Sequence, residues 1–425
     1  MKHPAYSLLF LVAVMYTSCS SDSSLDNNTT PQVKNEWTLM EDAYFGSKVD
    51  AFQVCANNNN VYVGYWDGTL EKPCVRKFNS LSKKWEYYGG APINVPGNVD
   101  PYEVRPTFMF SQDGDVSYVG FIRSLTELEC MLYRTTGGAW EQLPSVPLNL
   151  LPGYADGRGN IHQSDGFTFT AKNGKLYAAV HYDNHTWQSE ETCLAVFIYD
   201  NGNWSLLPQR ISYPLIPNSF SWKANFSYHM INVSKNGNIY LNYWLGEREP
   251  DKLSANVSVY NGNGWNRITT SDMYPINSTS VTYRFNLNVY EEGGKDYLTM
   301  APCLASEFGY TRVFTHNGMQ WKELSSPTPG ETPLLYTATS TCPECIFVKY
   351  GDTRGCVVKS YKNGAWSYTG KPGFATGGAG GVGGGYNQSF IYDSGYLYLA
   401  LSRDYYKNGT TITPRGMCVY RYKLQ

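Results

Sequence analysis

A polar turn containing glycine and followed by tryptophan recurs along the whole chain. The segments YDNGNWSLLP (199–208), YNGNGWNRIT (260–269), THNGMQWKEL (315–324) and YKNGAWSYTG (361–370) share this plan. Periods of 45 to 64 residues separate its copies, and periods near this range are typical of propellers and other repeat arrays. Seven tryptophans occupy the equivalent position: Trp37, Trp85, Trp140, Trp204, Trp265, Trp321 and Trp366.

Each interval between these tryptophans reads as four short strands. In the third interval GFTFTA alternates apolar and polar residues, KNG turns the chain and KLYAAVHY returns. The unit is completed by a longer loop, the strand CLAVFIY, the turn DNGN and the strand WSLLP. Asn-Gly turns have the left-handed geometry that two-residue hairpins require. Four-stranded antiparallel sheets repeated around an axis form a β-propeller, so we predict an all-β propeller.

The two ends of the repeat region predict how the ring closes. The sequence MCVYRYKLQ matches the third strand of a blade and has no tryptophan strand after it, whereas NEWTLM (35–40) is a tryptophan strand without a preceding blade. Pairing the two completes a seventh blade and leaves no open sheet edge. We therefore predict one seven-bladed domain over residues 35–425, with each repeat tryptophan wedged against the neighbouring blade.

Composition agrees with a β protein and narrows the classes of partner. The 36 Tyr, 11 Trp and 40 Gly residues suit strands and the turns between them. The 34 basic and 36 acidic residues give a net charge of −2. Because nucleic-acid binding requires a basic surface, this balance argues against a nucleic-acid partner.

The Gly-then-Trp blade endings resemble those of Kelch-like and galactose-oxidase-like propellers. Because such propellers include enzymes, glycan binders and scaffolds, the resemblance implies an architecture and no single activity.

The N-terminus is typical of a targeting segment. Lys2 and His3 precede an apolar run from Ala5 to Tyr16, and small residues then lead to Cys19. This arrangement resembles the lipoprotein signal peptides of Bacteroides-like bacteria, which implies a signal peptide over 1–18 and a lipid on Cys19. Residues 19–34 then form a polar tether, and the protein is held at the outer membrane or cell surface. The alternative is an uncleaved N-terminal helix anchor.

Cysteine and glycine motifs give no cofactor or metal site. Five cysteines recur in third strands, where we predict small buried side chains. Cys342 and Cys345, in TCPECI, form either a local disulfide or two thiols. The stretch TGGAGGVGGGYNQ (376–388) connects two blades and does not open a helix as a dinucleotide fingerprint must. The recurring cysteines are Cys74, Cys130, Cys193, Cys356 and Cys418.

Propeller geometry places the candidate surface on one face of the ring. Hairpins between strands one and two, and three and four, lie on one face and are short. Loops between strands two and three, with the connectors between blades, lie on the other, which we name the long-loop face. Function usually resides in long loops on a rigid scaffold. The predicted loops of the long-loop face include DNHTWQSEET, GEREPDKLSAN, RDYYKNGTTITPR, PLNLLPGYADGRGNIHQSDG and QRISYPLIPNSFSWKANF.

Four tryptophans outside the repeat fall on this face and suit stacking against a sugar or anchoring a protein partner. The alternative is that they pack loops onto the ring. They are Trp66, followed by Asp67, together with Trp187, Trp222 and Trp244.

A polar cluster in blade three forms a second group of candidates. His181, Asp183 and His185 occupy alternate positions, and His162 lies in the preceding connector. Such a group can bind a metal, act as acid and base, or simply form hydrogen bonds. We expect no metal, because no repeated ligand spacing supports one.

The starts of the innermost strands predict the lining of the channel mouth. Arg105 and Arg284 can hold a carboxylate or sulfate there, or can pair with Asp50 and Asp165. The predicted mouth residues are Asp50, Arg105, Asp165, Tyr228, Arg284 and Gln388.

The leading functional hypothesis is a monomeric, lipid-anchored propeller that binds a carbohydrate or an envelope protein through its long-loop face, without a cofactor. The first alternative is a polysaccharide lyase or glycoside hydrolase that uses His162, His181 or His185. The second is a scaffold without catalytic activity.

Overall fold

A computed structural model describes the chain in seventeen stretches. They are residues 36–41, 45–46, 49–97, 107–123, 129–154, 159–161, 166–185, 190–214, 226–247, 252–269, 276–277, 285–302, 312–328, 334–352, 355–375, 390–407 and 411–424. Residues 35–425 form one compact unit. No helix in these stretches is long and apolar enough to cross a membrane.

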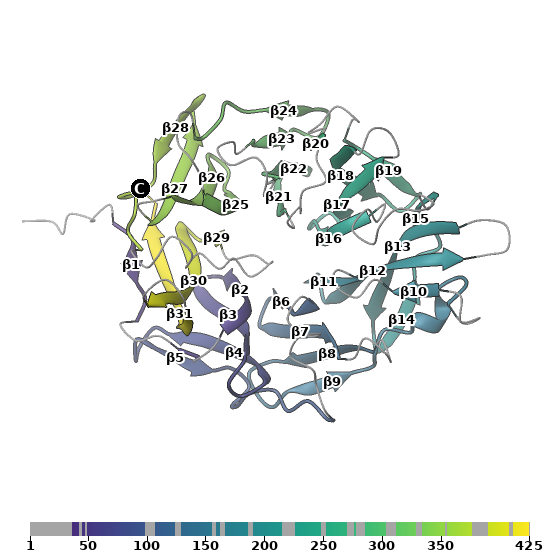
Figure 1. Cartoon of the computed structure of the whole chain (residues 1–425), viewed down its shortest axis with the longest axis horizontal. Helices are drawn as coiled ribbons and strands as arrows, with labels where there is room; N and C mark the ends of the chain where they lie inside the picture. The colour runs from purple at the N-terminus through teal and green to yellow at the C-terminus, as the bar shows by residue number, and fades with distance from the viewer. Residues whose placement is uncertain are drawn as a thin grey trace, which may run out of the picture. The chain divides into compact units, whose positions relative to one another are not determined.

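Seven antiparallel sheets surround a central axis (Figure 1), which confirms the predicted seven-bladed propeller. Blade one contains β2 (Val49–Asn57), β3 (Asn60–Asp67), β4 (Lys72–Asn79) and β5 (Lys84–Tyr87). Blade two contains β6 (Met109–Asp113), β7 (Val116–Ile122), β8 (Cys130–Thr135) and β9 (Glu141–Leu143). Blade three contains β11 (Phe167–Lys172), β12 (Lys175–His185), β13 (Glu190–Asp200) and β14 (Asn203–Leu206).

The remaining blades repeat this order. Blade four contains β16 (Phe226–Val233), β17 (Ile239–Glu247), β18 (Lys252–Tyr260) and β19 (Trp265–Arg267). Blade five contains β21 (Leu287–Glu292), β22 (Lys295–Met300), β23 (Phe314–His316) and β24 (Trp321–Glu323). Blade six contains β25 (Leu334–Thr341), β26 (Ile346–Asp352), β27 (Gly355–Lys362) and β28 (Ala365–Tyr368).

Blade seven closes the ring by pairing the two ends of the repeat region. It contains β29 (Phe390–Asp393), β30 (Tyr396–Lys407), β31 (Thr411–Lys423) and, from the other end of the chain, β1 (Thr38–Leu39). Thr38 lies opposite Arg421 in this pairing, and the Met40 N–H donates to the Val419 carbonyl at 2.9 Å. The predicted closure is therefore confirmed.

The repeat tryptophans join each blade to the preceding one, as predicted. Five of their indole N–H groups donate to a backbone carbonyl just beyond the outermost strand of the preceding blade. The pairs are Trp37 with Thr369 (2.9 Å), Trp204 with Pro144 (2.8 Å), Trp265 with Gln209 (3.1 Å), Trp321 with Ile268 (3.0 Å) and Trp366 with Ser325 (2.7 Å).

Trp140 joins blade two to blade one through a close approach to glycine. Gly89 has φ of +86°, and a Cβ added there would lie 2.4 Å from Nε1 of Trp140. The neighbouring Gly90 has φ of +80°, but a Cβ there would meet nothing within 4 Å. Position 89 therefore requires glycine both for its backbone and for the room that the indole takes.

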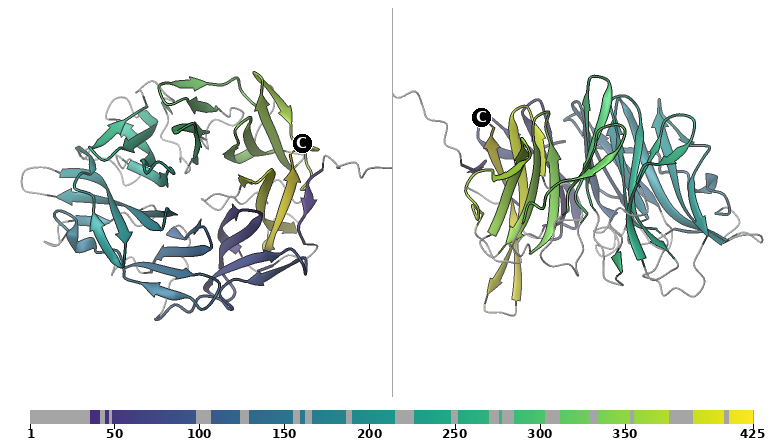
Figure 2. Two further views of the ribbon diagram at one scale, coloured as in Figure 1. Left: turned by 180° about the vertical axis from the view of Figure 1, so that it is seen from behind. Right: turned by 90° about the horizontal axis from the view of Figure 1, so that it is seen from above.

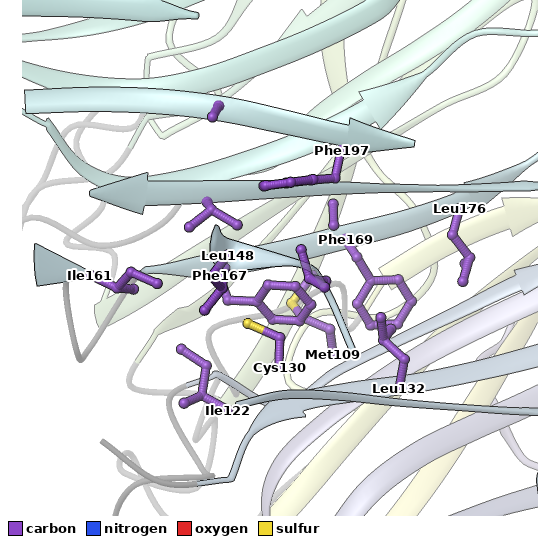
Figure 3. Close-up of a cluster of buried hydrophobic side chains, with 14 of the residues drawn as sticks. Met109, Ile122, Cys130, Leu132, Leu148, Ile161, Phe167, Phe169, Leu176 and Phe197 are labelled. Atoms are coloured by element: carbon purple, nitrogen blue, oxygen red, sulfur yellow. The ribbon is translucent and has the colours of Figure 1, made fainter. Parts of the chain in front are cut away.

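Most of the hydrophobic core lies in the seams between blades. Figure 3 shows Met109, Ile122, Cys130 and Leu132 of blade two facing Phe167, Phe169, Leu176 and Phe197 of blade three. Leu148 and Ile161 of the intervening connector pack on the same cluster. The five cysteines predicted to be buried in third strands are all buried. Cys342 and Cys345 are not joined by a disulfide, so of the two alternatives the structure has two thiols.

Hydrogen bonds between neighbouring short hairpins link the blades on the face opposite the long loops. Asp296 of β22 is the centre of the densest group, because its carboxylate accepts from Asn236 (2.6 Å), Asn238 (2.7 Å) and Tyr240 (2.8 Å) of blade four. Burial alone would raise the pKa of Asp296, but hydrogen bonds from these residues and Ser234 outweigh it and hold the pKa below its usual value.

The structure corrects one prediction about the long-loop face. Three segments predicted as loops continue as paired strands. The last pairs are His185 with Glu190 in β12 and β13, Glu247 with Lys252 in β17 and β18, and Lys407 with Thr411 in β30 and β31. The alternation of apolar and polar residues that marks a strand is weak in these segments, so the sequence did not indicate the pairing.

The connectors between blades add short strands to the extended hairpins. In blade three β10 (Gly159–Ile161) pairs with β12, and β15 (Ile211–Pro214) pairs with β13. In blade four β20 (Ile276–Asn277) pairs with β18. The connector before β10 also contains a short 3-10 helix, η2 (Leu148–Leu150). We name the four-stranded layer formed by 159–161, 182–185, 190–194 and 211–214 the outer sheet of blade three.

The close approach of Trp140 to Gly89 leads to a first prediction. Gly89→Ala and Gly90→Ala both place a side chain at positive φ, which costs about 1–2 kcal/mol. Gly89→Ala must also displace the indole, at a further cost of about 1–3 kcal/mol. Urea unfolding should therefore show a larger loss for Gly89→Ala than for Gly90→Ala. Equal losses would show that the tryptophan contact does not stabilise the seam.

The lowered pKa of Asp296 leads to a second prediction. Its ionised carboxylate stabilises the fold above the unfolded-state pKa of about 3.9, and this contribution disappears as the pH falls through the lower folded-state pKa. Asp296→Asn should therefore lower the free energy of unfolding at pH 7 and flatten its pH dependence below about pH 4. Tyr240→Phe, which removes one donor, should have a smaller effect. Unfolding curves of Asp296→Asn that follow the wild-type pH dependence would refute this assignment.

Candidate functional site

The long-loop face remains the candidate surface, and the structure describes part of its predicted site. Arg105, His162, Asp165, Trp187, Trp222, Arg284, Gln388 and the predicted lipid-bearing Cys19 lie outside the described residues. For Asp50, His185 and Tyr228 the structure describes the backbone position within a strand. Trp66, Asp67, His181, Asp183 and Trp244 are described in full.

Two predicted residues of the channel mouth lie in irregular positions of innermost strands. The register of β2 shifts between Val49 and Phe52, and that of β16 shifts between Ser227 and Met230. Asp50 and Tyr228 fall within these two bulges. Bulges occur often beside binding sites, where they change the direction of the strand residues. A third shift, between Leu334 and Ala338 of β25, gives blade six the same feature.

Trp66 and Trp244 are not exposed, which corrects their predicted role as stacking platforms. Both side chains are 0% exposed. Trp66 packs at a steep angle against Phe121 of the next blade (ring centroids 6.2 Å apart), and Trp244 packs similarly against Phe285 (5.3 Å). Because fully buried rings cannot stack on a sugar, these two tryptophans have a packing role. They fill the seams between blades, whereas the predicted alternative was that they pack loops onto the ring.

Asp67 likewise has a structural role where ligand binding was predicted. It is 3% exposed, and its Oδ1 accepts from the N–H groups of Thr69 (3.0 Å) and Leu70 (3.1 Å). An aspartate that bonds the backbone two and three residues ahead fixes a turn. Asp67 therefore shapes the β3–β4 turn.

His181 is held in the seam between blades three and four. Its ring is 0% exposed, and its Nε2 forms a hydrogen bond with Oγ1 of Thr192 at 2.8 Å. The His229 ring of β16 packs edge-on against it, with centroids 6.1 Å apart. Among the described residues no group of three or more His, Cys, Asp or Glu side chains could hold a metal. Of the predicted alternatives for His181, hydrogen bonding is what the structure shows.

The opposite face of the same strand carries a polar group that the sequence analysis did not identify. Tyr182 lies directly across from Cys193, and Asn184 lies across from Glu191, all in the outer sheet of blade three. Arg210, next to β15, donates to Oε2 of Glu191 at 3.0 Å. We name these five residues the Tyr182 cluster.

The Tyr182 cluster is buried at its centre and reaches solvent at one edge. Tyr182, Asn184 and Cys193 are buried, whereas the side chains of Arg210 and Glu191 are 30% and 27% exposed. Burial is the main reason that the pKa of the Cys193 thiol rises to about 11. Burial also raises the pKa of Tyr182, and the adjacent Cys193 adds to this effect.

The polar groups at the centre of the cluster are enclosed by the protein. Cys193 shares side-chain hydrogen bonds with the Tyr182 hydroxyl and with Arg210. Among the described residues, Oδ1 of Asn184 has no donor. A Cβ added to Gly153 would lie only 2.3 Å from Oδ1 of Asn184, so the connector backbone closes over this acceptor. Leaving such a group unsatisfied costs about 1–3 kcal/mol. The edge with Arg210 and Glu191 is therefore the part of the cluster that a further polar partner can reach.

One signal in the sequence could have pointed to this cluster. Residues of a strand alternate between its two faces, so the pattern HYDNH that placed His181 and Asp183 on one face necessarily placed Tyr182 and Asn184 on the other. Arg210 and Glu191 gave no such signal, because the pairing of β15 with β13 depends on a connector that showed no strand pattern.

No protein-family model matches this sequence, and no curated protein sequence matches it either. Several solved structures are similar in fold. A protein of unknown function from Dyadobacter fermentans is 13% identical, with a TM-score of 0.43, and the match covers 92% of this chain and 98% of that one. Aleuria aurantia lectin in complex with α-methyl-L-fucoside is 11% identical, with a TM-score of 0.43, over 77% of this chain and 98% of the lectin.

A third similar structure is the polysaccharide lyase Uly1. It is 13% identical, with a TM-score of 0.48, and the match covers 94% of both chains. At these identities and TM-scores, none of the three assigns a function or a site residue to this chain.

The burial of Trp66 leads to a third prediction. Trp66→Ala should remove about 3–5 kcal/mol from the free energy of unfolding because it leaves a large cavity in the seam. Trp66→Phe, which fills most of that space, should remove less. Chemical denaturation monitored by circular dichroism measures both. An unchanged unfolding midpoint for Trp66→Ala would contradict the seam assignment.

Proposed function

We propose that this chain is a carbohydrate-binding propeller whose ligand contacts the outer sheet of blade three. The partly exposed pair of Arg210 and Glu191 at the edge of the Tyr182 cluster carries the proposal. A sugar hydroxyl both donates and accepts, so one such group can accept from Arg210 and donate to Glu191. The partly exposed side chains of Arg210 and Glu191 form the edge at which the hydroxyl meets the cluster.

The form of this site also favours a binding protein. Paired strands carry the cluster, and side chains on strands are held more precisely than side chains on loops. The ion pair between Arg210 and Glu191 (3.0 Å) is partly exposed, so a ligand can reach it from its solvent side. The buried ring of His181 gives the enzyme alternative no support.

The proposal includes attachment to the cell envelope. The resemblance of residues 1–18 to lipoprotein signal peptides supports a lipid on Cys19, with residues 19–34 as a tether. Display at the outer membrane or cell surface would bring the propeller to polysaccharides outside the cell. The Gly-then-Trp blade endings support a relationship to Kelch-like and galactose-oxidase-like propellers.

Ligand-observed NMR on the chain from Ser20 onward, with a panel of neutral and acidic oligosaccharides, tests the proposal. We expect saturation transfer to at least one sugar without new anomeric or unsaturated-sugar signals. Glu191→Ala and Arg210→Lys should each weaken that binding about fivefold or more, because each removes or displaces one hydrogen-bonding group worth about 1 kcal/mol. Asp200→Ala, which breaks the Lys175–Asp200 ion pair at the other end of β13, is the matched control.

Three outcomes would overturn the proposal. Binding that is unchanged in both cluster variants would place the ligand elsewhere. Product signals that grow with time would establish catalysis and favour the enzyme alternative. Silence across the panel would leave an envelope protein as the partner.

A further inference from the structure

Two thiols lie together at the turn between β25 and β26, the first two strands of blade six (Figure 1). The Cys342 N–H donates to the Cys345 carbonyl at 2.9 Å, and the Cys345 N–H donates back to the Cys342 carbonyl at 3.4 Å. Residues 343–344 form the loop between them. The pair continues the strand register directly, because Thr341 lies opposite Ile346.

This register places the two cysteine side chains on one face of the hairpin. Residues that exchange both backbone hydrogen bonds lie directly opposite each other, with Cα atoms about 5.5 Å apart, and their side chains interact on a shared face. Cys345 accordingly shares a side-chain hydrogen bond with Cys342. Because disulfides join Cα atoms about 4.4–6.8 Å apart, the backbone spacing allows a bond between the two sulfurs.

The two thiols differ in their access to solvent. Cys342 is 8% exposed and belongs to the hydrophobic cluster between blades six and seven. Cys345 is half-buried and packs against that cluster. A small reagent can therefore reach Cys345 more easily, while the less exposed Cys342 is already in contact with it.

A disulfide at this turn adds little to the stability of the fold. The cross-link closes a loop of four residues, 342–345, and the entropy that a disulfide removes from the unfolded chain grows with the length of the loop. Cβ atoms of opposite residues also lie about 4.5–5.5 Å apart, whereas in disulfides they lie about 3.8 Å apart. Bond formation must draw the two residues together, which favours a disulfide that is readily reduced.

A charged pair beside the turn acts on the thiol of Cys345. Nζ of Lys362 lies 2.7 Å from Oε2 of Glu344, and both side chains are exposed. Burial is the main reason that the pKa of the Cys345 thiol rises to about 11, and Cys342 and Glu344 add to the rise, whereas Lys362 opposes it. Because the thiolate is the attacking form of a cysteine, Cys345 should react slowly at neutral pH and faster as the pH rises.

We propose that Cys342 and Cys345 form a thiol–disulfide exchange site that takes a low-molecular-weight disulfide as its substrate. The Cys345 thiolate attacks one sulfur of the small disulfide, and the thiolate that leaves takes up the proton that Cys345 lost. Cys342 then attacks the sulfur of Cys345 in the mixed disulfide, and the second small thiol leaves with the proton of Cys342. Two protein thiols are thus oxidised to one disulfide, while one small disulfide is reduced to two thiols.

The exchange site lies on the face of the ring opposite the long loops. In Figure 2 (right) the yellow β30–β31 hairpin, which joins strands two and three of blade seven, extends past the neighbouring blades and marks the long-loop face. The β25–β26 turn joins strands one and two, so it belongs to the other face. The inference therefore goes beyond the proposed carbohydrate function and uses none of its residues.

Equilibration of the chain from Ser20 onward with mixtures of reduced and oxidised glutathione tests the inference. Acid quenching, alkylation of free thiols and peptide mass spectrometry then give the state of each cysteine. We expect the peptide with Cys342 and Cys345 to lose two hydrogens as the oxidised share of glutathione rises, and to regain them when reduced glutathione is restored. Cys55 is also half-buried but lies opposite Tyr62, so it is the internal control and should form no disulfide within the chain.

Two results of this titration would overturn the inference. One is a pair of thiols that stays reduced in every mixture of reduced and oxidised glutathione. The other is oxidation by a protein oxidant that carries a reactive disulfide, but by neither oxidised glutathione nor cystine, which would make the substrate a protein.

Two serine variants separate the roles of the thiols. Cys342→Ser removes the second attacking thiol, so this variant should accumulate glutathione on Cys345 as a mixed disulfide. Cys345→Ser leaves only the buried thiol and should accumulate at least about tenfold less, because access limits its reaction. Circular dichroism checks that both variants are folded. Equal accumulation in the two variants, or accumulation only in urea, would contradict the proposed order of attack.

The rate of oxidation gives a test that a purely structural pair of cysteines would fail. Between pH 7 and pH 9 the rate should rise about tenfold per pH unit, since a pKa of about 11 keeps the Cys345 thiolate a minor form in this range. At pH 8, Glu344→Gln should speed the reaction about twofold or more, and Lys362→Gln should slow it by a similar factor. A rate that depends on neither the pH nor these charges would show that Cys345 is not the attacking thiol.

Discussion

The contact between a tryptophan of one blade and the backbone of the preceding blade is the interaction on which the ring depends. A four-stranded sheet has two faces to bury, and in a propeller both can be covered only by neighbouring blades. The indole supplies a large apolar surface for the seam. Its N–H donates a hydrogen bond to the backbone of the preceding blade, as Trp366 does to the Ser325 carbonyl at 2.7 Å. Repetition of this contact sets the position of each blade relative to the one before it.

This dependence explains why so much of the fold could be predicted and so little of the site. Each of the seven repeat tryptophans packs against the preceding blade, so their spacing reveals the number of blades and the closure of β1 on β31. Trp66 and Trp244 also pack between blades. They lie in second strands and outside the repeat, however, so in the sequence they resemble residues that could bind a ligand. Their burial depends on neighbours such as Phe121 and Phe285, which are distant in sequence.

The candidate site was missed for a related reason. Local alternation predicts the two faces of β12, but it does not predict which neighbour covers each of them. The face with His181 looked richer because histidine is chemically versatile, and the seam with blade four buries it. The face with Tyr182 is covered by the connector, since Leu148 and Ile161 pack with it in one cluster. Arg210 reaches the edge of this face beside β15, which adds to β13. Strand addition by a connector depends on the three-dimensional path, and the sequence of that connector shows no strand period.

Strands that continue past the ring are thus the feature that connects this fold to a function. Within the ring, adjacent blades cover both faces of a sheet, and polar side chains there must find partners inside the protein. Where strands continue past the ring, connectors cover part of them, as Leu148 and Ile161 do in blade three. An edge that stays partly exposed can present residues to a ligand without losing the rigidity of the ladder. In blade three the ion pair of Arg210 and Glu191 lies at such a partly exposed edge, and in blade seven β30 and β31 stay paired as far as Lys407 and Thr411.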